Sequence, residues 1–323
     1  MWMIGEESMA VKVLFTYDYG KENMNSIKEL GYDVSIIDEK KAAFSESIKD
    51  TEVLVCYNPF NSLDISLLKD LRYIQLSSIG IDQLPIDIVK QSNIQVCNNK
   101  GGYSIPIGEW IVMSILQLMK NSHGLYRNQL NKLWKMKTNI LEVYGKTIGF
   151  IGTGSIAVEA AKRLKGFGVG LIGINTNGRN IDYFDECHSI EQLDQILSIC
   201  DVVVITVPST KETKHLIDKA AFSKLKRGAF LVNVARGSIL DESALIESLK
   251  TGNLAGAALD VFEEEPLGKD SELWTLSNAI ITPHNSWISE MRNERRWKLI
   301  YENLRRYING EDLVNKVDLE KGY

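Results

Sequence analysis

The sequence predicts an α/β protein with two doubly wound parallel sheets, each covered by helices. Its 323 residues are 44% hydrophobic and 24% charged, an ordinary globular composition that is long enough for two buried cores. Short apolar, β-branched segments alternate along the chain with segments of helical periodicity. Because the connections between these segments are too long for hairpins, we expect parallel strands with helices on both faces.

The first domain is expected to comprise residues 1–100 and 289–323. Its predicted strands are residues 11–17, 33–37, 52–56, 73–76 and 95–97. The segment after Ser289 is rich in Arg, Glu and aliphatic residues at helical spacing. We therefore expect a C-terminal helix that packs back on the first domain.

The second domain is expected to span residues 101–288. A helix beginning near Ile105 connects it to the first domain and precedes a second series of apolar strands. These strands are residues 146–151, 169–174, 202–207, 229–234, 255–260 and 279–282, each ending at a polar or Gly-rich turn.

Composition argues against several classes of function. The formal net charge of −5 and the absence of a long basic run argue against nucleic acid as a partner. The most apolar segment, residues 105–119, contains Glu109 and is shorter than the roughly 20 apolar residues of a membrane span. No membrane association is therefore expected.

The chain also lacks features of secreted and metal-binding proteins. Glu6 and Glu7 lie where a signal peptide would have basic residues, which favours a cytoplasmic protein. The four cysteines have neither a C-x-x-C pair nor a His at metal-ligand spacing, so no metal site is predicted.

A dinucleotide site is predicted at the segment from Gly152 to Ala157. The sequence Gly152-Thr153-Gly154-Ser155-Ile156-Ala157 follows an apolar strand and opens a helical stretch. In the G-x-G-x-x-G/A pattern, the first glycine permits a tight turn, the second lets the backbone approach a pyrophosphate, and the small last residue allows close helix packing. Exposed amides at the helix N-terminus would bind the phosphates.

The end of the next strand bears on the choice between NAD and NADP. Asn175, Thr176, Asn177 and Arg179 lie where an NAD enzyme usually places the carboxylate that binds the ribose hydroxyls. Without that carboxylate nothing repels a 2′-phosphate, and Thr176, Asn177 and Arg179 can donate hydrogen bonds to one. We favour NADP over NAD. In the alternative, Arg179 is a solvated loop residue and the protein uses NAD less selectively.

Three further segments lie at the ends of later strands. Arg236 follows one strand, the run from Asp260 through Glu265 to Pro266 follows the next, and Thr282-Pro283-His284 follows the last. Taken singly, these are a surface charge, a solvated acidic loop and a structural histidine. Because ligands of open α/β sheets bind beyond the carboxyl ends of the strands, we expect the three to share one site.

In combination these motifs resemble the D-2-hydroxyacid dehydrogenase family over nearly the whole chain. The resemblance rests on the glycine turn, the Val207-Pro208-Ser209-Thr210 turn with Thr213 and Leu216, Asn-x-Ala-Arg-Gly, Asp-Val-Phe-x-x-Glu-Pro and Thr-Pro-His. It implies a Rossmann nucleotide-binding domain inserted into a flavodoxin-like substrate domain, with the active site in the cleft between them. It also implies a homodimer formed through the nucleotide-binding domain.

The family's catalytic residues correspond here to Arg236, Glu265 and His284. Reduction of a 2-oxo acid needs a hydride on carbon, a proton on oxygen and an anchor for the carboxylate. His284 would supply the proton, and Glu265 would fix its tautomer and favour its protonated form. Arg236 would hold the substrate carboxylate and polarise the carbonyl.

The resemblance assigns further contacts. The backbone amides of Ile79 and Gly80 would bind the substrate carboxylate. Cofactor contacts are implied at Val207, Pro208, Thr213, Val234, Ala235 and Asp260, in addition to Gly152, Gly154, Ser155, Ile156, Asn175, Thr176 and Arg179. Glu263 and Glu264 are expected to be solvated, and His123, His188 and His215 to be structural or exposed.

Among substrates we favour glyoxylate or hydroxypyruvate, because 3-phosphoglycerate would need additional cations that the sequence does not identify. Asn285 and Trp287 depart from the family pattern after His284, so they either alter the wall of the substrate pocket or belong to the core. An alternative function is a dinucleotide-sensing interaction protein, since corepressors that resemble this family keep the same catalytic residues.

Overall fold

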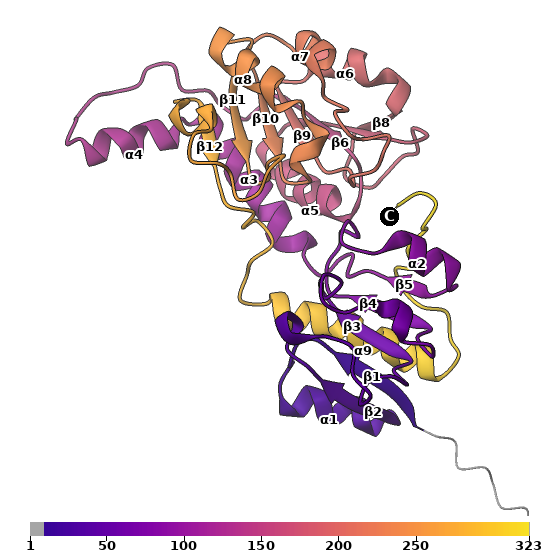
Figure 1. The fold of residues 1–323 in the computed structure, drawn as a ribbon. Coiled ribbons are helices and arrows are strands. Elements are labelled where there is room, and N and C mark those ends of the chain that lie inside the picture. Colours follow the sequence, from indigo (N-terminus) through magenta and orange to yellow (C-terminus); the bar gives the residue numbers. More distant parts are fainter. Residues whose placement is uncertain (1–9, 323) are drawn as a thin grey trace, which may run out of the picture. The chain divides into compact units, whose positions relative to one another are not determined.

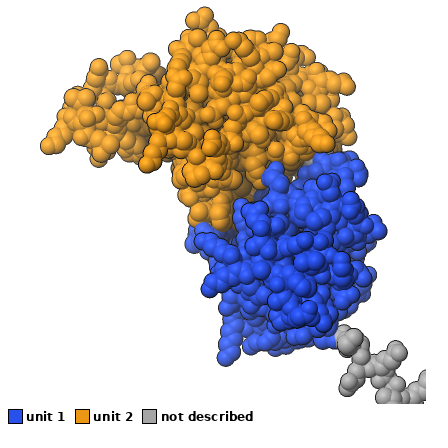
Figure 2. Space-filling model, viewed as in Figure 1, with its two compact units in different colours: residues 1–102, 290–323 blue, residues 103–289 orange. Residues whose placement is uncertain are grey.

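The computed structural model describes residues 10–322, which form two compact units (Figure 2). Unit 1 comprises Met1–Gly102 and Glu290–Tyr323, and unit 2 comprises Tyr103–Ser289. Each unit contains one fully parallel sheet with helices on both faces, which confirms the predicted fold class (Figure 1). Glu6 and Glu7 lie outside the described residues.

Unit 1 is built on a five-stranded sheet with the order β2-β1-β3-β4-β5. The strands are β1 (Val11–Phe15), β2 (Tyr32–Ile36), β3 (Val53–Cys56), β4 (Tyr73–Leu76) and β5 (Gln95–Cys97). Helices α1 (Lys21–Glu29), α2 (Ile86–Gln91) and α9 (Arg292–Ile308) accompany them. All residues of β3 and β4 are buried, because apolar side chains cover both faces of these central strands.

Helix α9 closes one face of this sheet, as the sequence predicts. Its side chains Trp297, Ile300 and Leu304 are buried in one cluster with Val13 and Phe15 of β1. This burial of large apolar side chains secures the C-terminal segment to the N-terminal strands.

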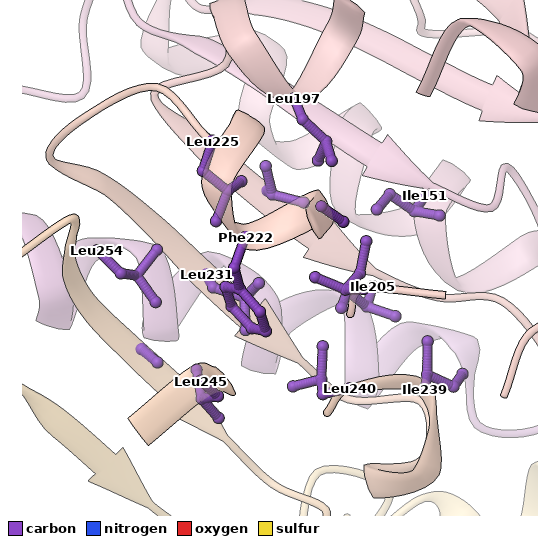
Figure 3. Packing of buried hydrophobic residues seen from close by; sticks show 14 of the residues in the cluster. Ile151, Leu197, Ile205, Phe222, Leu225, Leu231, Ile239, Leu240, Leu245 and Leu254 are labelled. Atoms are coloured by element: carbon purple, nitrogen blue, oxygen red, sulfur yellow. The ribbon is translucent and has the colours of Figure 1, made fainter. Parts of the chain in front are cut away.

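Unit 2 contains a seven-stranded sheet with the order β12-β11-β10-β9-β6-β7-β8. The strands are β6 (Thr147–Ile151), β7 (Gly170–Asn175), β8 (Glu186–Ser189), β9 (Val202–Ile205), β10 (Ala229–Asn233), β11 (Leu254–Leu259) and β12 (Ala279–Ile281). The helices are α3 (Ser104–Met119), α4 (Ser122–Leu130), α5 (Ser155–Leu164), α6 (Leu193–Ile199), α7 (Lys219–Lys224) and α8 (Glu242–Thr251). Figure 3 shows part of the aliphatic core on one face, where Leu231 of β10 lies among Phe222, Ile205 and Leu245.

The strand order places a topological switch at β6. Its neighbours β7 and β9 lie on opposite sides, so the connections leave β6 in opposite directions. This is the order of a Rossmann sheet, in which the loops after the first and fourth strands flank the nucleotide site.

Two features of the helices and strands bear on the predictions. Strand β8 was not predicted, because its sequence Glu-Cys-His-Ser has no apolar run and only its β7 side is paired. No helix among residues 10–322 is long and apolar enough to cross a membrane.

Candidate active site

The glycine turn of unit 2 has the geometry that close backbone packing requires. Gly152 has a φ of 96°, and a Cβ there would lie 2.8 Å from the carbonyl carbon of Thr206 and 2.9 Å from the Val207 nitrogen. The loops after β6 and β9 therefore touch through backbone atoms. A Cβ at Gly154 would meet nothing within 4 Å, so the second glycine faces open space.

Helix α5 begins directly after this turn with its first amides uncapped. Gly154 is the N-cap, and no side chain accepts a hydrogen bond from the first turn. An uncapped helix N-terminus beside an open glycine suits a phosphate group. Ser155 contributes a hydroxyl there, which accepts a hydrogen bond from Ser104 Oγ at 2.8 Å. These residues fit the pyrophosphate of a dinucleotide.

Asn175 shapes the turn at the end of β7. Its Nδ2 donates to Thr153 Oγ1 at 3.3 Å and to the Arg179 carbonyl at 2.8 Å, while its Oδ1 accepts from the Arg179 amide at 3.1 Å. Asn175 is buried and Thr176 is exposed. The Asn175 side chain thus holds the turn that presents Thr176 and Arg179.

The proposed acid and base residues come together in unit 2. Nδ1 of His284 lies 2.8 Å from Oε2 of Glu265, and the other carboxylate oxygen accepts from the Phe262 amide at 3.0 Å. With Nδ1–H donating to the carboxylate, Nε2 of His284 is the nitrogen left to exchange a proton with a substrate. Nε2 has no partner among residues 10–322. The geometry is that of a general acid or base with its orienting carboxylate.

The electrostatics of Glu265 keep it ionised. Burial raises the pKa of this carboxyl group, but hydrogen bonds from His284 and the Phe262 amide, with the charges of His284 and Arg236, outweigh burial and lower the pKa below its ordinary value. An anionic Glu265 is the state that can accept the imidazole hydrogen bond. The same interactions place Arg236 within electrostatic range of the pair.

Arg236 lies just beyond β10 in a tightly packed turn. The side chain of Asn233 donates to the Arg236 carbonyl at 2.9 Å and accepts from the Ala235 amide at 3.0 Å. A Cβ on the next residue, Gly237, would lie 1.8 Å from the carbonyl carbon of Phe262. The turn that carries Arg236 therefore rests directly on the backbone that leads to Glu265.

Asp260 organises the segment that carries His284. Its Oδ1 accepts from Thr282 Oγ1 at 2.6 Å and from the Asn285 amide at 2.9 Å, and its Oδ2 accepts from the Ser286 amide at 2.9 Å. The Asp260 carbonyl accepts from the His284 amide at 2.8 Å. His284 has a φ of 51°, an uncommon conformation for a residue other than glycine, and these bonds stabilise it.

Trp287 adds to the same support. Its indole nitrogen donates to the His284 carbonyl at 2.9 Å, and its ring meets the Tyr103 ring edge-on at 5.7 Å. Asn285 contributes its backbone amide to Asp260. Both residues that depart from the family pattern thus help to hold His284; an additional part in a pocket wall stays a prediction.

The loop after β9 brings the other predicted cofactor residues to the carboxyl edge of the sheet. Thr213 Oγ1 donates to the Pro208 carbonyl at 2.7 Å and accepts from the Thr210 amide at 2.8 Å, which closes the loop on itself. Val207 is half-buried beside the glycine turn and Pro208 is exposed, whereas Val234 and Ala235 are buried after β10.

In unit 1, the predicted substrate turn has an arrangement suited to binding an anion. The carbonyls of Ser78, Ile79 and Gly80 accept hydrogen bonds from the Asn99 amide, Asn98 Nδ2 and Ser78 Oγ respectively. Among residues 10–322 the amides of Ile79 and Gly80 have no acceptor. Asn98 and Asn99, which the sequence did not single out, are buried and orient this turn.

One pair near the site was not foreseen. Glu263 and His215 are both exposed, as expected, but Oε1 of Glu263 contacts Nε2 of His215. This contact could not be predicted from the sequence, because 48 residues separate His215 from Glu263. His123 and His188 have ordinary partners, the Ser277 carbonyl and the Gln192 side chain.

Fold and site together define unit 2 as a Rossmann-type dinucleotide-binding unit in which a histidine is paired with a carboxylate. The family model for the D-isomer specific 2-hydroxyacid dehydrogenase NAD-binding domain matches residues 112–286. The chain belongs to this family of oxidoreductases, as its sequence motifs predict.

Relatives with named activities agree with this membership. The chain is 33% identical over 281 residues to a glyoxylate reductase of Thermofilum pendens, covering 84% of this chain and 83% of that protein. It is 31% identical over 319 residues to a D-3-phosphoglycerate dehydrogenase of Methanocaldococcus jannaschii, covering 96% of this chain but only 60% of that protein.

A solved structure shares the fold across both units. The D-isomer specific 2-hydroxyacid dehydrogenase of Xanthobacter autotrophicus Py2, in complex with NADPH and MES, has a TM-score of 0.82 at 25% identity. The match covers 97% of this chain and all of that one.

Proposed function

We propose that this protein is an NAD(P)-dependent 2-hydroxyacid dehydrogenase that reduces a small 2-oxo acid, with glyoxylate or hydroxypyruvate as the favoured substrate. The observation that carries the proposal is the Glu265–His284 pair beside Arg236, held by Asp260 at the carboxyl edge of a Rossmann sheet. The named activities of the Thermofilum and Methanocaldococcus relatives support the reaction class.

In this mechanism His284 moves the proton. Nε2 donates it to the carbonyl oxygen of the 2-oxo acid and accepts it from the hydroxyl group in the reverse direction. Glu265 keeps Nδ1 protonated, so that Nε2 is always the reacting nitrogen. The hydride would be supplied or accepted by a nicotinamide held by the glycine turn and the loops after β9 and β10.

Arg236 and the Ile79–Gly80 turn would hold the substrate. The guanidinium group matches a carboxylate in shape and charge, and it opposes the negative charge that develops on the carbonyl oxygen. The amides of Ile79 and Gly80, which have no acceptor among residues 10–322, also suit a carboxylate. Because the Arg236 guanidinium and the two backbone amides all donate hydrogen bonds, we expect the enzyme to prefer a 2-oxo acid, which has a carboxylate, over a simple ketone, which has none.

For the cofactor we propose NADP in preference to NAD. Gly152, Gly154, Ser155 and Ile156 would bind the pyrophosphate, and Thr176 and Arg179 the 2′-phosphate. Val207, Pro208, Thr213, Val234, Ala235 and Asp260 would line the ribose and nicotinamide. Both carboxylate oxygens of Asp260 already accept hydrogen bonds. We therefore propose that the main role of Asp260 is to support His284, and that its contact with the carboxamide is secondary. The NADPH complex of the Xanthobacter protein supports the choice of cofactor.

The first test is steady-state oxidation of NADPH and NADH with glyoxylate, hydroxypyruvate, pyruvate and longer 2-oxo acids. We expect turnover with NADPH and one of the first two acids. His284→Ala and Arg236→Ala should each lower kcat/KM by about 10²-fold or more with cofactor affinity nearly unchanged. Normal turnover in His284→Ala would refute the assignment of the proton donor.

We also propose a homodimer formed through unit 2. Figure 1 shows α4 and the segment after it extending away from the seven-stranded sheet. Large apolar side chains of α4 and of the segment after it are strongly exposed, namely Leu130 (83%), Trp134 (102%), Met136 (84%) and Tyr144 (75%). A patch of this kind favours an interface, and the dimers of the family favour a second copy of this chain as the partner.

Sedimentation velocity tests the dimer. We expect about twice the 36.4 kDa chain mass for the protein and a monomer for Leu130→Lys/Trp134→Lys. Ile199→Lys, which changes an exposed apolar residue of α6, is the control and should remain dimeric. A monomeric wild-type protein at micromolar concentration contradicts the proposal.

A dinucleotide-sensing interaction protein is the alternative function. Tight cofactor binding without turnover on any of the acids would favour it. For the enzyme we propose a cytoplasmic location and small-molecule partners only, with neither nucleic acid nor membrane bound.

A further inference from the structure

His215 and Glu263 form a contact that the proposed reaction does not use directly. His215 lies in the loop after β9, and Glu263 lies two residues before Glu265. Nε2 of His215 contacts Oε1 of Glu263, and the two side chains are 43% and 40% exposed. The pair therefore links two loops at the carboxyl edge of the sheet.

Each residue of the pair is fixed to its own surroundings. His215 has a φ of 48°, and its amide donates to the Ser238 carbonyl at 2.8 Å. Ile217 continues this attachment by donating to the Ile239 carbonyl at 3.1 Å. The imidazole is thereby presented from a loop that is tied to the turn following Arg236.

Glu263 belongs to the short segment that sets the position of Glu265. The amide of the preceding residue, Phe262, donates to Glu265 Oε1 at 3.0 Å, and the opposite carboxylate oxygen holds His284. A displacement of residues 262–263 therefore moves the carboxylate that orients the acid/base histidine.

We propose that His215 and Glu263 are positioning residues: their contact holds the Glu265 segment against the loop after β9, and through Glu265 it sets the orientation of His284. This inference rests on the proposed function of Glu265 and His284. It also connects the acid/base pair to the loop of Val207, Pro208 and Thr213, for which we propose cofactor contacts.

The exposure of the pair separates a positioning role from a purely structural one. Solvent-exposed ion pairs contribute little to global stability. Small displacements of a catalytic group, in contrast, have large effects on rate. A positioning pair should thus affect turnover much more than the thermal unfolding midpoint.

The test compares His215→Ala, Glu263→Gln and the double variant with the wild-type protein. We expect kcat to fall about tenfold in each single variant and hardly further in the double variant, because both changes break one contact. Cofactor affinity and thermal midpoint should stay close to wild type. His215→Lys, which can still pair with Glu263, should recover part of the lost rate.

Glu264→Gln is the matched control, since it removes the neighbouring charge but not the contact. It should retain wild-type kcat. Equal losses in Glu264→Gln and Glu263→Gln, additive losses in the double variant, or losses that follow a lowered thermal midpoint would each overturn the proposal.

A proton NMR signal separates failure of this inference from failure of the proposed function. The chain has four histidines, so the downfield Nδ1 proton of His284, protected by its bond to Glu265, can be assigned by substitution. Broadening or loss of that signal in His215→Ala and Glu263→Gln supports the positioning role, even if the wild-type protein reduces none of the acids tested. An unchanged signal with unchanged kcat overturns it.

Discussion

Gly237 is the position where one added methyl group should disable the site. In Gly237→Ala, the new Cβ would lie 1.8 Å from the Phe262 carbonyl carbon, 2.1 Å from its oxygen and 2.3 Å from the Glu263 nitrogen. All three are backbone atoms, which cannot move aside by a change of rotamer. The segment before Glu265 must therefore shift as a whole.

The size of the shift follows from these distances. To reach an ordinary contact of 3.4 Å, the Cβ and the carbonyl carbon must separate by about 1.6 Å. Misplacement of a catalytic group by about 1 Å can cost ~10²-fold in rate. Overpacking in a dense region costs about 1–3 kcal/mol of folding stability. We expect Gly237→Ala to lower kcat by ~10²-fold and to destabilise the protein within this range.

The assay combines turnover, cofactor titration and thermal unfolding. Gly268→Ala is the control, because its Cβ would meet nothing within 4 Å and its φ is not in the left-handed region. That variant should keep full activity and gain a few tenths of a kcal/mol. If Gly237→Ala retains wild-type kcat, then Phe262 and Glu263 do not transmit position to Glu265, and the reasoning is refuted.

Two further predictions concern cofactor choice and pH. Asn175→Asp replaces the Nδ2 donor to Thr153 and Arg179 by a carboxylate oxygen, and we expect the ratio of kcat/KM for NADPH to that for NADH to fall. An unchanged ratio in Asn175→Asp would remove Asn175 from cofactor selection. Glu265 has a folded-state pKa below its ordinary value, so its contribution to stability is present above about pH 4.3, the unfolded value, and is lost as pH falls through the folded value. The difference in thermal midpoint between wild type and Glu265→Gln should therefore shrink as the pH falls, and a difference that stays constant down to the acid end of the titration contradicts the assignment.

The sequence predicted those parts of the molecule whose signal is local. Parallel strands of continuous apolar residues, the glycine turn and the amphipathic C-terminal helix each have a pattern within a short window. Strand β8 lacks such a pattern, since Glu186–Ser189 lies at an edge and pairs only with β7. Its existence depends on a neighbouring strand that supplies backbone hydrogen bonds.

The supports of the site were not predictable in the same way. Motifs identified Glu265 and His284, but not the bond from Phe262 to Glu265 or the contact of His215 with Glu263. Asp260 was predicted as a cofactor contact, but the hydrogen bonds that its carboxylate oxygens accept from the His284 segment were not predicted. Such roles depend on side-chain rotamers and on loops that meet only in the folded chain.

Arg236, Glu265 and His284 all belong to unit 2, together with Asp260, which supports the histidine. With the roles proposed above, the groups that would handle proton and charge all lie in one unit, while the Ile79–Gly80 turn lies in the other. This division would make proton transfer and the choice of acid separable in evolution. Substitutions in unit 1 would then change which 2-oxo acid is accepted while the proton-transfer residues are inherited unchanged.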